Sequence, residues 1–273
     1  MTERARHGFV RIGHGGTLDP LARGIVVIGM GSGCKKLYDM IDSSKVYIAE
    51  SRLGFSSRTL DCTGSFVAER KTDHITKDSL IGALNTFKGE ITQTPPLYSA
   101  LSMDGKRLYE YAREGLPLPR EIPSRKVQIY DQELLSYPDG NTIPDPCLRH
   151  YGFRIRDDGT TLLGPSSTPT LIFSTGFRSK RKTDTSKTNP NHVPIPSTPQ
   201  GLVFHSRIHC SSGTYVRALI ADIATHLGTV GHMTDLLRSE QSVFKLGGEA
   251  TLEMNECEDL EKVNRAIQAG NRL

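Results

Sequence analysis

A tight, glycine-rich loop around one carboxylate is the most distinctive chemical feature of this sequence. Residues 13–24 read GHGGTLDPLARG, with Asp19 directly before Pro20. Glycines let a backbone approach a ligand closely, and the following proline biases Asp19 toward an extended conformation. The loop lacks both the Gly-Lys-Ser/Thr of a P-loop and the glycine spacing of a dinucleotide-binding fingerprint. It therefore either presents a catalytic carboxylate or forms an Asx-type turn.

The rest of the composition narrows the class of protein without indicating a reaction. The 273 residues carry 34 Lys and Arg against 30 Asp and Glu, and this net charge of +4 is compatible with a polyanionic partner. Five scattered cysteines form no C-x-x-C pair or Cys/His cluster, which predicts a reducing compartment and no structural zinc. No apolar run approaches the ~20 residues of a membrane-spanning helix, so we expect no membrane partner.

Apolar periodicity places the loop in a domain of mixed strands and helices. Alternating stretches predict strands, and apolar residues at helical spacing predict helices. The expected strands are residues 45–53, 126–135 and 201–210, and the expected helices are residues 80–87, 106–113, 215–227 and 254–267. Because these elements do not alternate regularly, we expect an α+β domain with an antiparallel or mixed sheet.

One segment, residues 137–200, differs in composition from the rest of the chain. It holds most of the 15 prolines, and residues 176–199 are rich in Ser, Thr, Pro and Lys. Such a composition predicts a partly disordered insertion. Its basic run at 178–182 fits a solvated linker, a nonspecific phosphate contact or a nuclear address. We therefore expect a single domain made of residues 1–136 and 201–273.

Four blocks along the chain resemble the TruB/Pus4 family of tRNA pseudouridine synthases. The first is the loop at 13–24 together with DSSKVY at 42–47 and RLG at 52–54. TPPLYSALSMDGKRLYEYAREG at 94–115 resembles the long central signature of the family. SGTYVR at 212–217 and GHMTDLLR at 231–238 resemble the last two blocks. The order of the blocks is that of the family, which makes the resemblance specific.

The resemblance implies both a fold and a reaction. The fold is the pseudouridine synthase fold, an eight-stranded mixed, mostly antiparallel sheet flanked by helices, with a central RNA-binding cleft. The reaction detaches a uridine of the tRNA T loop, uridine 55 in tRNA numbering, at its N1 glycosidic bond, rotates the bound base and rejoins it through C5. Because no water is activated and no redox change occurs, no metal or organic cofactor is implied.

The resemblance also implies roles around the flipped base. Asp19 is the implied catalytic aspartate, acting on ribose C1′ as nucleophile or by assisting proton loss from the sugar. Arg217 is the implied partner cation, which favours an ionised carboxylate in a dry pocket. Tyr47 would stack on the base and take the C5 proton, and Leu236 would close the other side of the pocket. Tyr215 would orient the arginine or a phosphate.

Other residues are implied to contact RNA outside the base pocket. His14 would enter the T loop where the flipped base has left. Lys35, Lys45 and Arg238 would meet phosphates, although each also fits a solvated surface, and Asp61 would support the site arginine or an RNA hydroxyl. The implied partner is the T-arm of tRNA, with other RNAs that carry a T-loop-like hairpin as further candidates. We expect the protein to be a monomer.

The chain departs from the family pattern near both ends. The family usually opens with a strand bearing a Lys-Pro motif, whereas twelve residues precede Gly13, which predicts a missing strand and an exposed sheet edge. Too few residues follow Arg238 for the PUA domain of bacterial members, which favours the eukaryotic, fungal-type Pus4-like branch. The alternative is a catalytically impaired RNA-binding or tRNA-folding protein of the same fold. The nucleus, the cytoplasm and the mitochondrion are all candidate locations.

Overall fold

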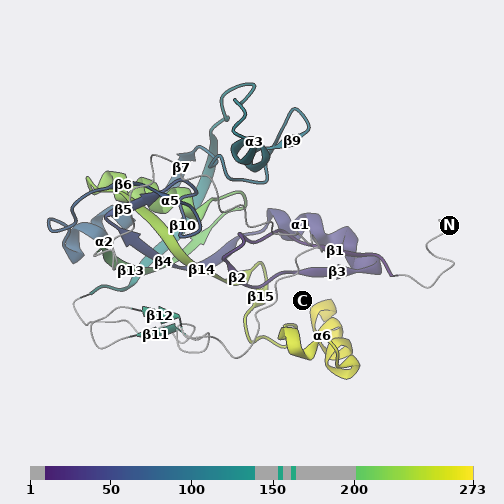
Figure 1. The fold of residues 1–273 in the computed structure, drawn as a ribbon. Coiled ribbons are helices and arrows are strands. Elements are labelled where there is room, and N and C mark those ends of the chain that lie inside the picture. Colours follow the sequence, from purple (N-terminus) through teal and green to yellow (C-terminus); the bar gives the residue numbers. More distant parts are fainter. Residues whose placement is uncertain (1–9, 139–152, 156–160, 164–200, 273) are drawn as a thin grey trace, which may run out of the picture.

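A seven-stranded sheet organises the part of the chain that the structure describes. This computed structural model describes residues 10–138, 153–155, 161–163 and 201–272 (Figure 1). The strand order is β15-β14-β4-β13-β10-β7 with antiparallel neighbours, and β2 joins β14 in parallel. These strands are β2 (Arg23–Gly24), β4 (Lys45–Leu53), β7 (Gly89–Gln93), β10 (Arg125–Ser136), β13 (Leu202–Cys210), β14 (Gly231–Gln241) and β15 (Phe244–Lys245). The predicted α+β class and mostly antiparallel sheet are confirmed, but the described residues form seven strands of this sheet and not the implied eight.

Two helices pack on one face of this sheet and enclose the main core. They are α2 (Lys77–Thr86), which begins at a capping box formed by Thr76 and Ser79, and α5 (Val216–His226). Alternate residues of β4 point to this face, where Leu53 shares one buried cluster with Leu219 of α5. The inward-facing residues of the strands and the apolar stripes of the two helices therefore pack together in a single core.

Periodicity located most elements correctly, but it missed boundaries that turns and caps decide. The strands predicted at 45–53, 126–135 and 201–210 are β4, β10 and β13, and the helices predicted at 80–87 and 215–227 are α2 and α5. Within the helix predicted at 106–113, β9 (Lys106–Arg107) pairs instead with β8 (Ser102–Met103). The helix α3 (Leu108–Glu114) follows and ends at Gly115, whose φ of 67° suits glycine.

The C-terminal helix predicted at 254–267 is in fact two elements. A short 3₁₀ turn, η3 (Met254–Glu256), precedes α6 (Leu260–Arg272). The Asp259 carboxylate accepts from the backbone N of Glu261 at 3.0 Å and of Lys262 at 3.1 Å. Because this side chain caps the helix, α6 begins at residue 260 and not at 254.

Smaller two-stranded units surround the main sheet. Strands β5 (Phe55–Ser57) and β6 (Phe66–Glu69) form one, and β11 (Phe153–Ile155) and β12 (Thr161–Leu163) form another. In Figure 1, α3 and β9 project away from the sheet on the side opposite to β11 and β12. The α3 unit has its own small core of Met103, Leu108 and Tyr111. Apart from β11 and β12, the predicted insertion and its 176–199 stretch lie almost entirely outside the described residues.

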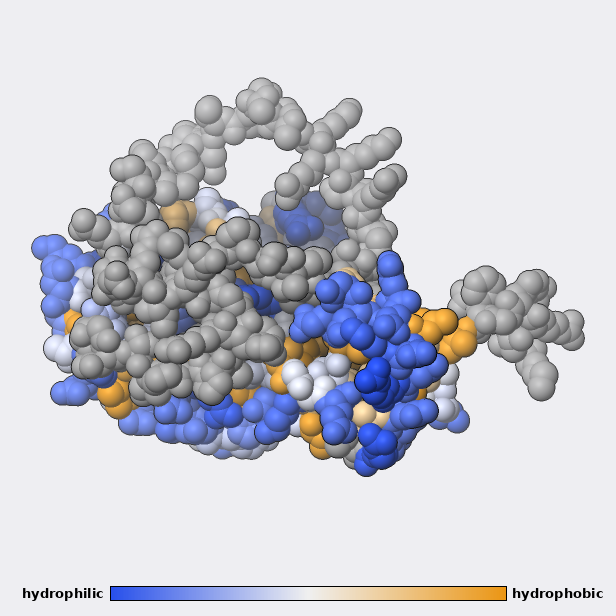
Figure 2. Space-filling view, turned by 90° about the horizontal axis from the view of Figure 1, so that it is seen from below, coloured by the Kyte–Doolittle hydropathy of each residue, from blue (hydrophilic) through white to orange (hydrophobic). Residues whose placement is uncertain are grey.

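A separate β-ribbon lies where the described chain begins. It pairs β1 (Ile12–His14) with β3 (Ile28–Met30), followed by η2 (Gly31–Lys36) and α1 (Leu37–Asp42). One face of the ribbon packs on Leu37, because Gly13 and Gly29 have no side chains there. The opposite face is open, with Ile12 62% exposed. Figure 2 shows apolar surface at this end of the molecule, beside the hydrophilic surface of α6. No helix within the described ranges is long and apolar enough to cross a membrane.

The glycine-rich loop is tied to the sheet at Gly24. The backbone N of Ile25 donates to Arg238 O at 3.0 Å, and the φ of Gly24 is 104°. A Cβ atom at Gly24 would lie 2.2 Å from Arg238 O, far inside van der Waals contact. A glycine is therefore required where β2 meets β14, and this contact sets the course of the loop that carries Asp19.

Replacing Gly24 should test this anchor. We expect Gly24→Ala to lower the free energy of unfolding by about 2 kcal/mol or more, because the left-handed backbone alone costs about 1–3 kcal/mol and the overlap with Arg238 O adds to it. Gly33→Ala is the matched control, because a Cβ there meets nothing within 4 Å. Urea unfolding of both variants measures the difference, and equal stability of the two would contradict the anchor.

Candidate active site

A bidentate ion pair joins the glycine-rich loop to the first turn of α5. The Arg217 guanidinium donates from Nε to Asp19 Oδ2 at 2.7 Å and from Nη2 to Asp19 Oδ1 at 3.0 Å. Arg217 lies two residues after Tyr215, the N-cap residue of α5. Its side chain is 4% exposed, whereas that of Asp19 is 29% exposed. A buried cation therefore holds the carboxylate while part of it stays open to a ligand.

The turn at Asp19 is made by its backbone. Asp19 O accepts from Ala22 N at 2.9 Å, and earlier in the loop Gly15 O accepts from Gln241 Nε2 at 2.5 Å. Both carboxylate oxygens of Asp19 accept from Arg217. This arrangement favours a presented carboxylate over the Asx-type turn, which would use the side chain for the turn itself.

Two backbone carbonyls complete the surroundings of the Arg217 guanidinium. Nη1 donates to Thr59 O at 2.7 Å, and Nη2 also donates to Tyr98 O at 3.0 Å. No sequence pattern predicts these contacts, because a carbonyl oxygen is present at every residue. A buried guanidinium is stable only when its donors find acceptors, so three segments far apart in sequence converge on this one group.

A second carboxylate, that of Asp61, lies near the same arginine nitrogen. Its Oδ2 is 3.8 Å from Arg217 Nε, and its side chain is 5% exposed. Its Oδ1 accepts from Thr59 Oγ1 and Thr63 Oγ1 at 2.6 Å each, and from Thr63 N at 2.9 Å. The structure therefore brings Asp61 to Arg217, and the threonine hydrogen bonds satisfy the oxygen that faces away from it.

Tyr47 and Leu236 line the core on neighbouring strands. Leu236 is buried, and Tyr47 packs against the same cluster together with Leu18 and Leu21 of the glycine-rich loop. Burial raises the pKa of the Tyr47 phenol to about 12, against an opposing effect of the nearby Arg238 charge. The phenol is therefore neutral at physiological pH, beside the loop that carries the catalytic candidate.

Tyr215 is held by two residues that sequence analysis did not single out. Gln93 hydrogen-bonds its backbone, and the Arg125 guanidinium lies 4.9 Å from the centre of its ring. Gln93 directly precedes the central signature at 94–115, so it fell one residue outside the block that carried the resemblance. Its position at the end of an alternating stretch, as a polar residue on a buried face, is the signal that could have found it.

The expected phosphate contacts of Lys45 and Arg238 need correction. Lys45 Nζ donates to the carbonyl oxygens of Ile41 and Ser43, both at 2.5 Å, and burial with the nearby Arg238 charge lowers its pKa to about 8. Arg238 is 2% exposed and donates from Nε to Ile25 O at 2.7 Å. Both cations are occupied inside the protein, where they hold the end of α1 and the glycine-rich loop.

His14 and Lys35 are exposed on the ribbon unit. His14 ends β1, and Lys35 lies in the last turn of η2. The ion pair of Asp19 and Arg217 is formed without them. Their predicted contacts with RNA therefore stay predictions about surface residues near the glycine-rich loop.

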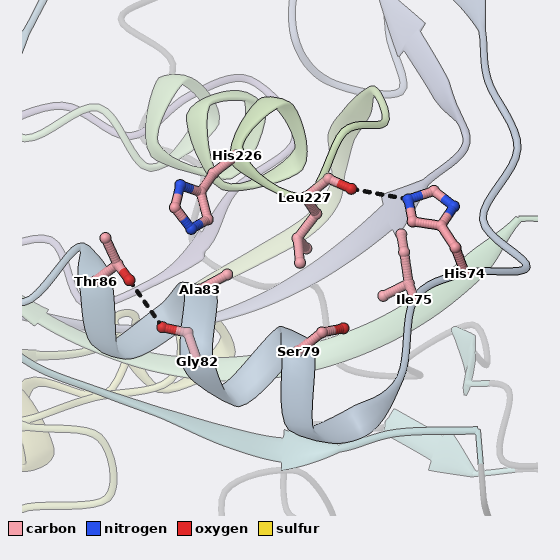
Figure 3. Close-up of a pocket in the computed structure, with 8 residues that line it drawn as sticks. All are labelled: His74, Ile75, Ser79, Gly82, Ala83, Thr86, His226 and Leu227. Atoms are coloured by element: carbon pink, nitrogen blue, oxygen red, sulfur yellow. Dashed lines mark hydrogen bonds between the residues drawn. The ribbon is translucent and has the colours of Figure 1, made fainter.

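A pocket at the far end of α5 is a different site. It has a volume of about 440 Å³ and is lined by residues of α2, the turn before it and the end of α5 (Figure 3). His74 Nε2 bonds Leu227 O at 2.9 Å, and Thr86 Oγ1 donates to Gly82 O at 3.0 Å. Both polar groups thus bond backbone carbonyls of the two helices that line the pocket. Across the residues that the structure describes, no cluster of His, Cys, Asp and Glu could hold a metal ion.

The neutral state of Tyr47 can be tested by titration. We expect the phenol to stay protonated up to about pH 11, because burial raises its pKa from 10.0 to about 12. NMR of protein labelled at tyrosine Cζ measures this directly, with Tyr47→Phe to assign the signal. A midpoint near pH 10 in the folded protein would contradict the raised pKa of the Tyr47 phenol.

Comparison with known proteins gives a consistent picture. The model of the family described as TruB family pseudouridylate synthase (N terminal domain) matches residues 4–145. The chain is 36% identical to tRNA pseudouridine synthase 4 of Saccharomyces cerevisiae over 87% of its own length and 62% of that protein. It is 34% identical to tRNA pseudouridine synthase 4 of Schizosaccharomyces pombe, over 90% and 68%. It is 32% identical to tRNA pseudouridine synthase B of Caldanaerobacter subterraneus, over 92% of its own length and 66% of that protein.

The chain thus spans about two thirds of the length of these relatives. Among solved structures, a chain in the crystal structure of a Cbf5-Nop10-Gar1 complex matches 96% of this chain and 53% of its own length, with a TM-score of 0.53 and 18% identity. That likeness concerns the fold alone. With a family model that matches half of its residues and relatives about one third identical along most of its length, this chain belongs to the TruB family of pseudouridylate synthases.

Proposed function

We propose that this protein is a tRNA pseudouridine synthase that converts uridine 55 of the T loop to pseudouridine. The observation that carries the proposal is the partly open Asp19 carboxylate, held by two hydrogen bonds from the buried Arg217. The names of the yeast and bacterial relatives support tRNA as the substrate. The T-arm as the recognised element, and a monomer as the active form, are parts of the same proposal.

The reaction is an isomerisation, and this fits a site built on one carboxylate. The N1–C1′ bond of uridine breaks, a C5–C1′ bond forms, and the proton on C5 leaves as N1 gains one. In one route Asp19 attacks C1′ and is later displaced, and in the other it assists proton loss from the sugar. Both routes need an ionised carboxylate, which the adjacent Arg217 guanidinium favours.

The side chains around Asp19 suit a single flipped base. Tyr47 offers a ring whose phenol stays neutral, and Leu236 offers an apolar surface from the next strand. Stacking on an aromatic ring returns about 1–3 kcal/mol to a base that has left its neighbours. In this proposal the Tyr47 oxygen takes up the C5 proton while its own phenol proton passes to the base, which gains one at N1. Tyr215 lines the pocket, and His14 fills the place that the base has left in the T loop.

The second candidate is an RNA-binding or tRNA-folding protein without catalysis. Its surface would still have to recognise RNA, but it would have no use for a buried cation that holds a partly open carboxylate. Asp19 and Asp61 both face Arg217, and carboxylates near phosphate oppose RNA binding through charge repulsion. The geometry of the pair therefore favours the enzyme.

Replacing Asp19 tests the proposal directly. We expect Asp19→Asn to slow tritium release from C5-labelled uridine in a T-arm transcript by at least about 1,000-fold, as for other essential nucleophiles. Binding of the transcript should change little. Asp131→Asn is the matched control, because that carboxylate pairs with Lys88 on the surface. Release by Asp19→Asn at the wild-type rate would refute the catalytic role, and binding without release by the wild type would favour the second candidate.

Replacing Arg217 tests the pair. We expect Arg217→Lys to keep the charge but to reduce turnover at saturating tRNA by about 100-fold, because the single ammonium nitrogen of lysine cannot reproduce the two parallel hydrogen bonds of the planar guanidinium. The tRNA dissociation constant should rise much less. Single-turnover rates and filter binding on one preparation give both values. Equal losses in the two would mean that Arg217 binds phosphate.

A further inference from the structure

Gln93 binds the backbone of a residue that is 122 positions away in sequence. It ends β7 and is 1% exposed. Its Oε1 accepts from Tyr215 N at 2.8 Å, and its Nε2 donates to Tyr215 O at 3.0 Å. Both ends of the amide are thus used on one residue, and this fixes the position and the orientation of the Tyr215 backbone.

Tyr215 is the residue at which α5 begins. A helix start is usually satisfied by a Ser, Thr, Asp or Asn side chain, and Tyr215 provides no such cap. Its carbonyl already accepts the first helical hydrogen bond, from Leu219 N at 3.1 Å. Gln93 therefore accepts, from another strand, the N-cap N–H of this helix start, as the second side chain of a capping box would. Because α-helix geometry is rigid, holding Tyr215 also holds Arg217 two residues later.

A second contact holds the same residue from the next strand. Arg125 is the direct neighbour of Gln93 in the β7–β10 register. Its guanidinium lies 4.9 Å from the centre of the Tyr215 ring, and it donates to Gly213 O. Gln93 thus holds the backbone of Tyr215 and Arg125 holds its ring, from the edge strand β7 and its neighbour β10.

The geometry points to Gln93 as a positioning residue of the reaction. We propose that it fixes the start of α5 so that the Arg217 guanidinium meets Asp19 with both hydrogen bonds at once. A bidentate pair at 2.7 and 3.0 Å tolerates little displacement, and a misplacement of about 1 Å at a reacting group can cost about 100-fold in rate. The expected effect of Gln93 on the reaction rate rests on the proposed function. Its expected effect on the geometry of the Asp19–Arg217 pair does not.

The first test removes both hydrogen bonds and keeps the length of the side chain. We expect Gln93→Met to reduce the single-turnover rate at saturating tRNA by roughly 10- to 100-fold, with the tRNA dissociation constant within about twofold of wild type. The matched control is Gln132→Met, because Gln132 is also buried and donates to a helix carbonyl, Leu84 O, on α2. An unchanged rate in Gln93→Met, or the same loss in both variants, would overturn the proposal.

A double-mutant cycle separates positioning from a general loss of stability. If Gln93 acts through Arg217, Gln93→Met should slow the Arg217→Lys enzyme by less than about threefold, because the bidentate pair is already absent. Full multiplication of the two effects would overturn the proposal. Gln93→Glu is a useful third variant, because it can still accept from Tyr215 N but cannot donate to Tyr215 O, so its rate should fall between wild type and Gln93→Met.

An observation that does not depend on turnover keeps this test distinct from that of the proposed function. The Nε–H signal of Arg217 in ¹⁵N NMR, assigned by its loss in Arg217→Lys, reports the hydrogen bond to Asp19. We expect this signal to shift or broaden in Gln93→Met and to stay unchanged in Gln132→Met. An unchanged signal in Gln93→Met would overturn the inference even if the rate falls. A changed signal in a protein without synthase activity would support the positioning of Arg217 by Gln93 and reject the proposed function.

Discussion

The burial of one guanidinium is the constraint on which the rest of the site depends. Arg217 is almost completely removed from water, and a buried cation left without partners would destabilise the fold by several kcal/mol. Its donors therefore fix where Asp19, Thr59 and Tyr98 must lie. These residues come from three segments that are separate in sequence, and α5 and the sheet are the elements that bring them together. The hydrogen bonds that stabilise the buried Arg217 charge therefore also hold Asp19, the catalytic candidate, in place.

Charge balance around Arg217 explains why two carboxylates can share one arginine. Asp61 is buried but receives three hydrogen bonds on one oxygen, so much of its charge is satisfied locally. Arg217 also lies in the first turn of α5, where unpaired backbone N–H groups carry partial positive charge that favours nearby anions. Asp19 thereby pairs with a cation that lies at the positive end of a helix. Its remaining exposed part is the direction from which a substrate can reach it.

The sequence predicted the elements with strong periodicity, since burial of one face dictates that periodicity. It also predicted, through resemblance, that Asp19 and Arg217 meet. It failed for Lys45 and Arg238, because a lysine or arginine looks the same in sequence whether it faces solvent or donates to a buried carbonyl. Gln93 was missed for a related reason. It binds the backbone of Tyr215, and backbone atoms are the same at every position, so the residue types do not reveal the contact. Contacts to the backbone thus set the limit of what the residues alone could reveal.

The unequal exposure of the ion pair has a consequence for catalysis. Arg217 has no room for a ligand, so a base that enters the site covers the open side of Asp19 and not the cation. Covering that side removes water from the carboxylate, and electrostatic interactions strengthen as the local dielectric constant falls. The attraction of the pair would then increase as a ligand covers Asp19, which holds the carboxylate more firmly against Arg217. A surface arginine could not do this, because water would continue to screen it. The orientation of Arg217 that Gln93 fixes therefore matters most once a ligand covers Asp19.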